Sequence, residues 1–359
     1  MADQTYIQNA VGTGCDFLVS LPKGRRPRIL QLTDMQVIDA AQRRYSDRLN
    51  EREIACWATE QVDGQCYAHI RSLVAETQPD LIFITGDVIY GEFDDSGRSF
   101  IDFCGFMDGL GIPWAPVFGN HDNESVRGVA WQCDRFEGAR HCLFKRGEVT
   151  GNGNYTVGIS VGGRLCRVLY MMDSNGCGAG TDPALRRVPG FGEDQVAWLA
   201  ARAEVIRAPG FVAFHIPSAD FADAAHSCGY ETEDDHKNYV IGVDVPSQNG
   251  DFGCHREVCG AFAPPQGFRD VLHTAGVDGV FVGHCHAINT SILWDGIRWT
   301  FGLKTGQYDY HIPGHIGGTL ITLFPDAPTG AIPNNDDLAP FVVRHIPSLT
   351  LYAPFPNGN

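Results

Sequence analysis

The sequence contains no stretch of about 18 apolar residues, and this absence excludes an ordinary membrane-spanning helix. Basic residues are also in short supply. The 27 lysines and arginines stand against 43 aspartates and glutamates, which gives a formal net charge of −16. A surface this acidic repels polyanions, so we expect no nucleic-acid polymer as a partner. The N-terminus lacks the basic start and apolar core of a signal peptide, which predicts a cytoplasmic protein.

Glycine and cysteine, by contrast, are plentiful. The 42 glycines among 359 residues predict many tight loops. The 12 cysteines follow no zinc-finger spacing, and their even number would suit disulfides in a secreted or periplasmic protein. The compartment therefore stays open between these two interpretations, and the oligomeric state stays open as well.

The first third of the chain alternates apolar runs with helical patterns. Apolar residues recur at helical spacing over 48–78, with a break expected near Gly64, and more weakly over 96–109. Three short apolar runs are typical of buried strands, at 28–33, 80–85 and 114–118. This order of elements predicts a βαβαβ unit with a parallel sheet.

The remainder of the chain repeats the alternation less regularly. The segment 220–262 shows no periodicity, so we interpret it as a cap or substrate loop, with a purely structural insert as the alternative. The other elements expected here are a hairpin over 154–172, helices over 192–206 and 266–276, and strands at 211–215, 280–284, 297–302 and 318–324.

Five segments place metal-ligand residues at the ends of strand-like runs. Because the carboxyl ends of parallel strands meet at one edge of a sheet, we expect these side chains to form one cluster. Two carboxylates there repel each other unless a cation lies between them. Two cations about 3.5–4 Å apart form a clamp for in-line attack on phosphorus. The five segments are Asp34-Met35-Gln36, Gly86-Asp87-Val88-Ile89-Tyr90, Gly119-Asn120-His121-Asp122, His215 and Gly283-His284-Cys285-His286.

Each member of this set also has a plainer interpretation. Asp87 could cap the next helix, Asn120 could be a turn residue, and His215 could be a core histidine with satisfied hydrogen bonds. The order of the whole set favours the metal site. His284 and His286 are two positions apart, so in an extended segment both imidazoles point the same way.

The ordered motifs resemble those of calcineurin-like metallophosphoesterases, which run D-x-H, G-D, G-N-H-D/E, H and G-H-x-H. The resemblance covers about residues 28–325 and is strongest with the purple acid phosphatase-like branch of the plant type-29 and yeast kind. Four segments carry the likeness to that branch: GNHDNES at 119–125, LYMMDSNG at 169–176, AFHIPSADF at 213–221 and FGLKTGQYDYHIPG at 301–314.

The resemblance implies two metal sites and an α/β fold. His121 would stabilise the transition state or protonate the leaving oxygen, and the Asp122 carboxylate is predicted to orient its imidazole. A hydroxide held by the metals would attack phosphorus directly, without a covalent enzyme intermediate. The ligands implied are Asp34, His286 and a bridging Asp87 for the first metal, and Asp87, Asn120, His215 and His284 for the second.

One position departs from the family pattern. Gln36 stands where a histidine is usual, and glutamine is a poorer ligand for transition metals. Gln36 could bind weakly through its oxygen, the first site could be loose, or another residue could substitute. Tyr90 is the candidate substitute, because true purple acid phosphatases also lack this histidine and bind iron(III) through the tyrosine of G-D-x-x-Y. The alternative is that Tyr90 only packs on the sheet.

The metal pair implied is Fe(III) with a divalent Zn, Fe or Mn ion, and Mn/Mn or Zn/Zn is the alternative. The activity implied is metal-dependent hydrolysis of small phosphomonoesters. Phosphodiester or nucleotide hydrolysis on the same core is the second hypothesis, and a non-catalytic relative that binds phosphate or a partner is the third. Five residues beside the motifs are candidate substrate contacts, with scaffold roles as the alternative: Asn123, Glu124, Lys304, Tyr308 and His311.

The expected architecture is a four-layer αββα sandwich, in which two central mixed β-sheets are flanked by helices. The first sheet is expected from the βαβαβ unit and the second from the strands of the later half. Residues 28–325 would form this domain. A segment at 1–27 would precede it as an N-terminal extension, and 326–359 would follow as a C-terminal wrapping segment.

Overall fold

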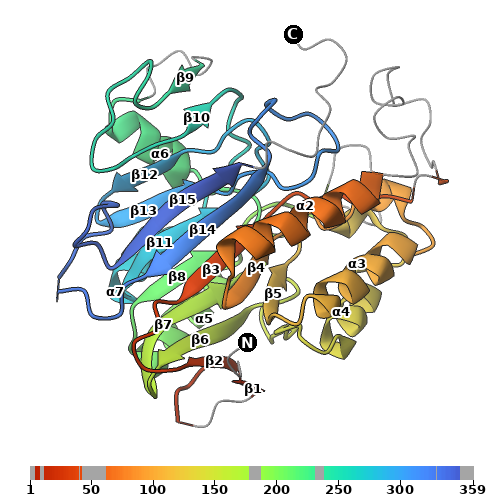
Figure 1. Ribbon diagram of the computed structural model, residues 1–359, viewed down its shortest axis with the longest axis horizontal. Coiled ribbons are helices and arrows are strands. Elements are labelled where there is room, and N and C mark those ends of the chain that lie inside the picture. Colours follow the sequence, from red (N-terminus) through yellow and green to blue (C-terminus); the bar gives the residue numbers. More distant parts are fainter. Residues whose placement is uncertain are drawn as a thin grey trace.

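Two mixed β-sheets face each other at the centre of the molecule, and helices cover their outer faces (Figure 1). This arrangement confirms the predicted αββα sandwich. The computed structural model describes residues 5–8, 12–39, 41–42, 62–177, 187–230, 238–328 and 330–347.

The smaller sheet contains the predicted βαβαβ unit. Strands β3, β4 and β5 run parallel, and α2 (Val62–Thr77) and α3 (Arg98–Gly109) connect them. Two strands from the C-terminal part of the chain complete the sheet antiparallel to β3. In spatial order the strands are β15 (Phe341–Pro347), β14 (Gly317–Leu323), β3 (Arg28–Leu32), β4 (Leu81–Thr85) and β5 (Trp114–Val117).

The larger sheet holds eight strands and includes the start of the chain. Its central pairs β7–β8, β8–β11 and β11–β13 are parallel, whereas the pairs β1–β2, β6–β7 and β12–β13 are antiparallel. The order is β1 (Thr5–Gln8), β2 (Phe17–Leu21), β6 (Tyr155–Val161), β7 (Arg164–Met171), β8 (Gly210–Ala213), β11 (Val277–Val282), β13 (Ile297–Phe301) and β12 (Ser291–Trp294).

The expected division of the strands between the sheets was wrong in two places. The strand predicted at 318–324 belongs to the first sheet, where Leu320 pairs with Leu30 of β3. Strand β2, from the segment predicted as an extension, pairs with β6 in the second sheet. The physical reason is that strands of both sheets are buried and apolar, so hydrophobicity alone does not specify their partners.

The helices form the two outer layers. Helix α2 begins at Val62 and contains Gly64, and the expected helical residues 48–61 lie outside the described part of the chain. The segment 220–262 is more regular than expected, since it carries a helix and a two-stranded sheet. The further elements are α4 (Val129–Gly138), α5 (Glu193–Ile206), α6 (Asp220–Ser227), α7 (Phe268–Thr274), β9 (Tyr239–Val240), β10 (Cys254–His255), η2 (Gly91–Phe93) and η3 (Asp122–Glu124).

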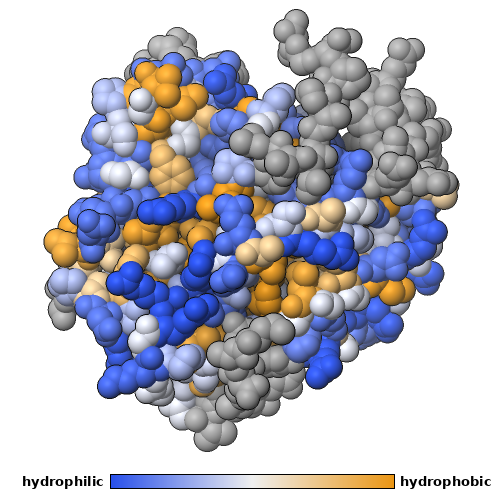
Figure 2. All heavy atoms as spheres, in the orientation of Figure 1, coloured by the Kyte–Doolittle hydropathy of each residue, from blue (hydrophilic) through white to orange (hydrophobic). Residues whose placement is uncertain are grey.

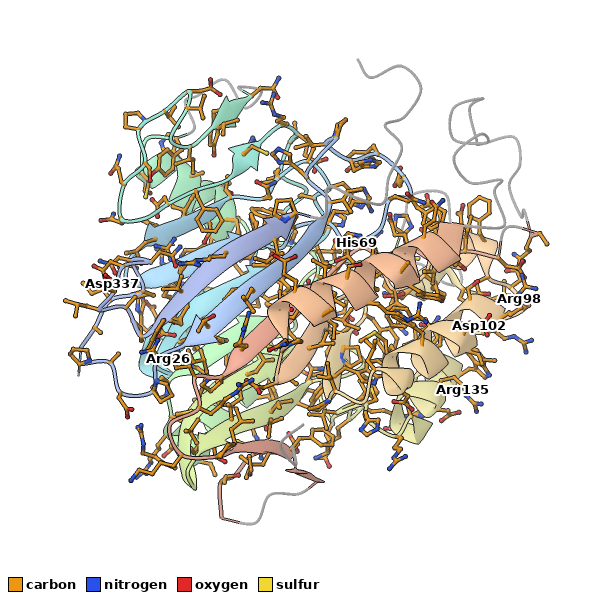
Figure 3. The ribbon with its side chains drawn as sticks, in the orientation of Figure 1. Arg26, His69, Arg98, Asp102, Arg135 and Asp337 are labelled. Atoms are coloured by element: carbon orange, nitrogen blue, oxygen red, sulfur yellow. The ribbon has the colours of Figure 1, made fainter. Side chains whose placement is uncertain are left out.

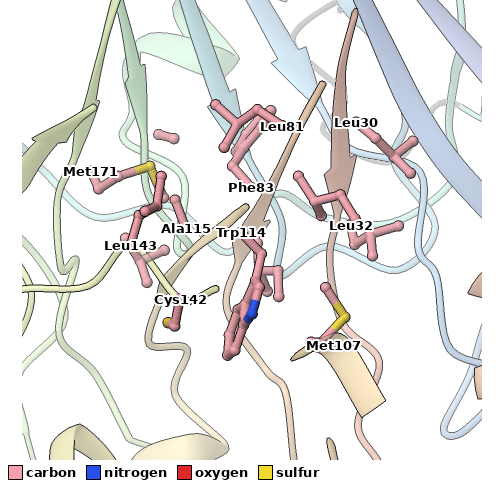
Figure 4. Close-up of a cluster of buried hydrophobic side chains, with 14 of the residues drawn as sticks. Leu30, Leu32, Leu81, Phe83, Met107, Trp114, Ala115, Cys142, Leu143 and Met171 are labelled. Carbon is pink, nitrogen blue, oxygen red and sulfur yellow. The ribbon is translucent and has the colours of Figure 1, made fainter. Parts of the chain in front are cut away.

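Aromatic and aliphatic side chains fill the space between the sheets. The rings of Phe83 on β4 and Phe281 on β11 meet edge to face with centroids 5.7 Å apart, which links one sheet to the other. On the outer face of the smaller sheet, the fully buried Trp114 of β5 (Figure 4) packs edge to face against Phe103 of α3 and Phe136 of α4. This apolar filling fixes how the strand ends of the two sheets face each other.

The surface and the helices give three further observations. Hydrophobic residues gather at the surface over the part of the molecule that carries β9 and α6 (Figure 2). No helix in the described part of the chain is long and apolar enough to cross a bilayer. The cysteines that the structure describes all carry free thiols.

Candidate metal centre

Five strand ends converge where the two sheets face each other. Asp34 lies two residues beyond β3, and Asp87 lies two residues beyond β4. Asn120 follows β5, His215 follows β8, and His284 follows β11. Since the strands of each group are parallel, their carboxyl ends bring these side chains to one place.

The tightest group of candidate ligands is Asp34, Asp87 and His286. One ligand atom from each lies within 4.8 Å of the others, and all three side chains are buried. His286 Nε2 is 3.4 Å from Asp34 Oδ1. Asp34 Oδ1 and Asp87 Oδ2 are buried acceptors that no hydrogen-bond donor satisfies. Such orphaned carboxylate oxygens fit a bound cation, because leaving them unpaired in the interior is costly.

A second group adjoins the first through Asp87. His215 Nε2 lies 3.0 Å from Asn120 Oδ1 and 3.3 Å from Asp87 Oδ2. His215 Nδ1 lies 2.7 Å from the carbonyl oxygen of Thr85, so the hydrogen of a neutral imidazole is placed on Nδ1. Burial alone would lower the pKa of His215, but the charge of Asp87 raises it to about 9, so Nε2 is protonated in the metal-free protein. In the neutral form that binds a metal, the lone pair of Nε2 points at two other acceptors. A cation fits this convergence of three acceptor atoms, and the fully buried setting suits one.

His284 lies beside both groups. Its backbone N–H donates to Asp34 Oδ2 at 3.1 Å, and its ring meets that of His215 edge to face at 5.2 Å. Burial and the repulsion from His215 lower the pKa of His284 to about 3. A neutral imidazole is the form that binds a metal. The six ligands implied by the resemblance are therefore brought together.

The carboxylates of the cluster are held ionised. Burial acts to raise the pKa of Asp34, but the contact with the His286 imidazole and the charge of His215 outweigh it. Burial acts in the same direction on Asp87, and the charges of His215 and His121 lower its pKa to about 2. Two buried anions so close together repel each other, and a cation between them would remove this repulsion.

The backbone of the cluster is strained. Asp34, Gln36, Asp87 and His284 all have left-handed φ angles, of 53°, 49°, 51° and 73°. Non-glycine residues in this region cost on the order of 1–3 kcal/mol each and persist only where the surroundings impose them. The concentration of four such residues in one cluster makes it a candidate functional site.

Two glycines allow the loops to approach this closely. A Cβ atom on Gly119 would lie 2.1 Å from Asp87 Oδ1, and one on Gly283 would lie 2.0 Å from Thr33 Oγ1. Neither contact is sterically possible. The glycine of the G-N-H-D motif and that of G-H-C-H are therefore required by the packing of ligand loops against each other.

Gln36 is not placed as a metal ligand through its oxygen. Its Oε1 accepts a hydrogen bond of 2.7 Å from Lys304 Nζ, which also donates to the backbone oxygen of Asp34 at 3.1 Å. Lys304 is 2% exposed. This hydrogen bond argues against Gln36 as a weak metal ligand through its oxygen. That oxygen is engaged by a buried ammonium group 268 residues away in the sequence.

The partner of the His121 imidazole is Glu124, and the prediction that Asp122 orients this ring was wrong. His121 Nδ1 lies 2.8 Å from Glu124 Oε2. The two oxygens of Asp122 instead accept the backbone N–H groups of Ile89 and Gly119. Burial alone would lower the pKa of His121, but the charges of Glu124 and Asp87 raise it to about 10.

Tyr90, Asn123 and Tyr308 lie around this centre. The Tyr90 ring stacks on His121 with centroids 3.9 Å apart. Asn123 Nδ2 donates to the carbonyl of Gly176, and Asn123 Oδ1 is a buried acceptor without a donor. Tyr308 is 2% exposed and its hydroxyl donates to Asp63, which gives it a scaffold role.

Comparison with known proteins identifies the family of this chain. Residues 27–287 match the family described as calcineurin-like phosphoesterase, and the chain belongs to that family. It is 24% identical to Probable inactive purple acid phosphatase 29 of Arabidopsis thaliana over 324 residues, which cover 81% of this chain and 74% of that protein. It is 26% identical to Probable inactive purple acid phosphatase 14 of the same plant over 323 residues, covering 81% and 73%.

Two solved structures align over most of this chain. GAP50, the anchor in the inner membrane complex of Plasmodium, aligns with a TM-score of 0.44 and 11% identity, over 91% of this chain and 86% of that chain. TT1561 of Thermus thermophilus aligns with a TM-score of 0.43 and 10% identity, over 84% and 95%.

Proposed function

We propose that this protein hydrolyses small phosphomonoesters at a centre of two metal ions. The observation that carries the proposal is the convergence of two ionised carboxylates, an amide oxygen and three imidazoles beside a separately held histidine, His121. The metal ligands proposed are Asp34, Asp87 and His286 for one ion, and Asp87, Asn120, His215 and His284 for the other. When bound, the two cations supply charge neutralisation at the phosphoryl oxygens and a lowered pKa of water.

His121 is the proposed proton donor to the leaving oxygen. Its Nδ1 is held by Glu124, its backbone N–H is held by Asp87 Oδ1 at 2.9 Å, and Tyr90 covers one face of its ring. These three contacts leave Nε2 available to a substrate. Because Glu124 stabilises the imidazolium form, His121 carries the proton that a departing alkoxide needs.

A non-catalytic role is the competing hypothesis. It draws support from Gln36, which is bonded to Lys304 instead of presenting an imidazole to the first metal. The arrangement of His121 and Glu124 favours catalysis, because binding phosphate through metal ions alone does not require a positioned proton donor.

Replacing His121 by asparagine separates these two hypotheses. We expect kcat for p-nitrophenyl phosphate to fall about 10²–10⁴-fold, the usual contribution of a general acid. The metal content should stay that of the wild type, since His121 is not among the proposed ligands. The measurement is steady-state kinetics with elemental analysis of the same samples. Equal kcat in the two proteins would contradict the proposed role of His121.

The choice between monoesters and diesters needs its own measurement. Because two cations neutralise the charge of a dianionic monoester better than that of a monoanionic diester, we expect kcat/KM to be higher for p-nitrophenyl phosphate than for bis(p-nitrophenyl) phosphate. A reversed order would assign the protein to phosphodiester or nucleotide hydrolysis.

The first metal is proposed to be iron(III), with Tyr90 as its fourth protein ligand and a divalent ion beside it. The engagement of Gln36 by Lys304 leaves three ligands at this position, and Tyr90 follows Asp87 at the spacing G-D-x-x-Y. We expect a visible tyrosinate-to-iron absorption band in the iron-loaded protein and its loss in Tyr90→Phe. A colourless wild type with a full complement of iron would exclude this ligand and favour Mn/Mn or Zn/Zn.

A further inference from the structure

The segment from Phe252 to Glu257 pairs with the stretch of chain directly after His286. This pairing comes from the region between the ligand-bearing strands β8 and β11, for which the sequence predicted a cap or a structural insert. The backbone hydrogen bonds run from Ser291 N–H to Phe252 O at 2.9 Å, from Asn289 N–H to Cys254 O at 2.9 Å, and from Arg256 N–H to Ala287 O at 2.9 Å.

A side chain supplies the last hydrogen bond of this ladder. Glu257 Oε1 accepts the backbone N–H of Ala287 at 2.6 Å, at the residue that directly follows His286. Glu257 Oε2 accepts the hydroxyl of Tyr310 at 2.7 Å. Both bonds are charge-assisted, and such bonds are roughly twice as strong as neutral ones. One carboxylate therefore joins the loop of His286 to the loop of Tyr310.

Tyr310 in turn contacts the imidazole of His286. The two rings lie 4.5 Å apart at an angle of 32°, and His286 Nδ1 lies 3.0 Å from the carbonyl oxygen of Tyr310. A hydrogen bond to this carbonyl requires that Nδ1 carry the hydrogen, which leaves the lone pair on Nε2. Nε2 is the atom that faces Asp34.

We propose that Glu257 is a positioning residue for the first metal site. Glu257 holds the backbone N–H of Ala287, directly after His286. It also holds the hydroxyl of Tyr310, the residue whose carbonyl oxygen orients the His286 ring. Outer contacts of this kind fix the tautomer and direction of a ligating histidine, and their loss typically lowers metal affinity about 10–100-fold. The inference rests on the two-metal centre of the proposed function.

The second proposed metal depends less on this contact. Two of its ligands, Asn120 and His215, follow β5 and β8, and the His215 ring is held by the carbonyl of Thr85. His284 shares the loop of His286, but its backbone N–H is held separately by Asp34 Oδ2. Loss of Glu257 should therefore weaken one binding step more than the other, whereas a general loss of structure would weaken both equally.

The test is Mn²⁺ binding to the metal-free protein, monitored through the electron paramagnetic resonance signal of the free ion. Mn²⁺ is chosen because it prefers oxygen and nitrogen ligands to the free thiols of this chain. For Glu257→Ala we expect one of two dissociation constants to rise about 10–100-fold. Glu257→Gln keeps an acceptor oxygen for Ala287 and should restore much of the affinity. Val258→Ala, at an exposed neighbour, is the matched control and should bind as the wild type does.

Wild-type affinity in Glu257→Ala, or an equal weakening of both steps, would overturn the proposal. A wild type that takes up a single Mn²⁺ contradicts the two-metal centre itself. In that case the ¹⁵N shifts of His286 in the metal-free protein test whether Glu257 positions the imidazole. We expect a fixed Nδ1–H tautomer in the wild type and Glu257→Gln, and a mixture of tautomers in Glu257→Ala. An unchanged tautomer in Glu257→Ala would exclude a positioning role.

Discussion

Replacing Asp87 by asparagine is expected to remove both metal ions and to lower kcat/KM by at least about 10³-fold. Asp87 is the residue shared by the two proposed ligand groups, and its Oδ2 is a buried acceptor without a donor. The charge stabilisation that bound cations provide is several kcal/mol, and each 1.36 kcal/mol is tenfold in rate. An amide of the same size keeps the packing and removes the charge.

The same variant should be less stable than the metal-free wild type. Burial and the repulsion from Asp34 act to raise the pKa of Asp87, but the charges of His215 and His121 lower it to about 2, so the carboxylate stabilises the metal-free fold at neutral pH and the substitution removes that stabilisation. Elemental analysis and urea unfolding of the metal-free proteins check the two parts of this expectation. Asp102→Asn is the control, because Asp102 is exposed on α3 and lies in the outer helical layer (Figure 3). Wild-type metal content in Asp87→Asn would contradict the bridging role.

Replacing Lys304 by methionine is expected to destabilise the metal-free protein by about 3–5 kcal/mol, the usual cost of removing one member of a buried charge group. Lys304 Nζ is the donor to Gln36 Oε1 and to Asp34 O, and its charge offsets that of Asp34. Without it Gln36 Oε1 loses its donor and the carboxylates lose a counter-charge. Bound Mn²⁺ should recover part of this loss, since the cation neutralises the same carboxylates and stabilises the folded state by mass action.

Urea unfolding with and without saturating Mn²⁺ measures both effects. The matched control is Lys145→Met, which removes a lysine that is 52% exposed and pairs with Asp16 at 2.9 Å. Pairs of this exposed kind contribute about 0–1 kcal/mol. A loss below about 1 kcal/mol in metal-free Lys304→Met, or an equal loss with and without Mn²⁺, would show that Lys304 does not compensate the cluster.

The sequence predicted the convergence of the candidate ligands because these residues follow a local pattern. Each of the residues Asp34, Asp87, Asn120, His215 and His284 stands two or three positions beyond a strand, and parallel strands carry such residues to one edge. No long-range contact has to be known for this inference. The partition of the strands between two sheets, in contrast, depends on pairings such as β14 with β3, which hydrophobicity does not encode.

The hydrogen-bond partners of Gln36 and His121 show two different limits of prediction from the sequence. Lys304 contacts Gln36 from 268 residues away, and no spacing rule connects the two positions. Glu124 could have been found from the sequence. His121 and Glu124 are three residues apart at the start of the 3₁₀ turn η3, and in such a turn positions i and i+3 lie on the same side. Asp122, one residue after His121, points elsewhere and is bonded to the backbone.

The measurement that bears most directly on the proposed activity is the metal count and the turnover of p-nitrophenyl phosphate, determined on one sample of the metal-loaded wild type. The ligand groups around Asp34, Asp87 and His215 predict two ions per chain and hydrolysis that is lost on chelation. Two bound ions without turnover of the monoester or the bis ester at any pH would contradict a catalytic role and leave a metal-dependent binding protein.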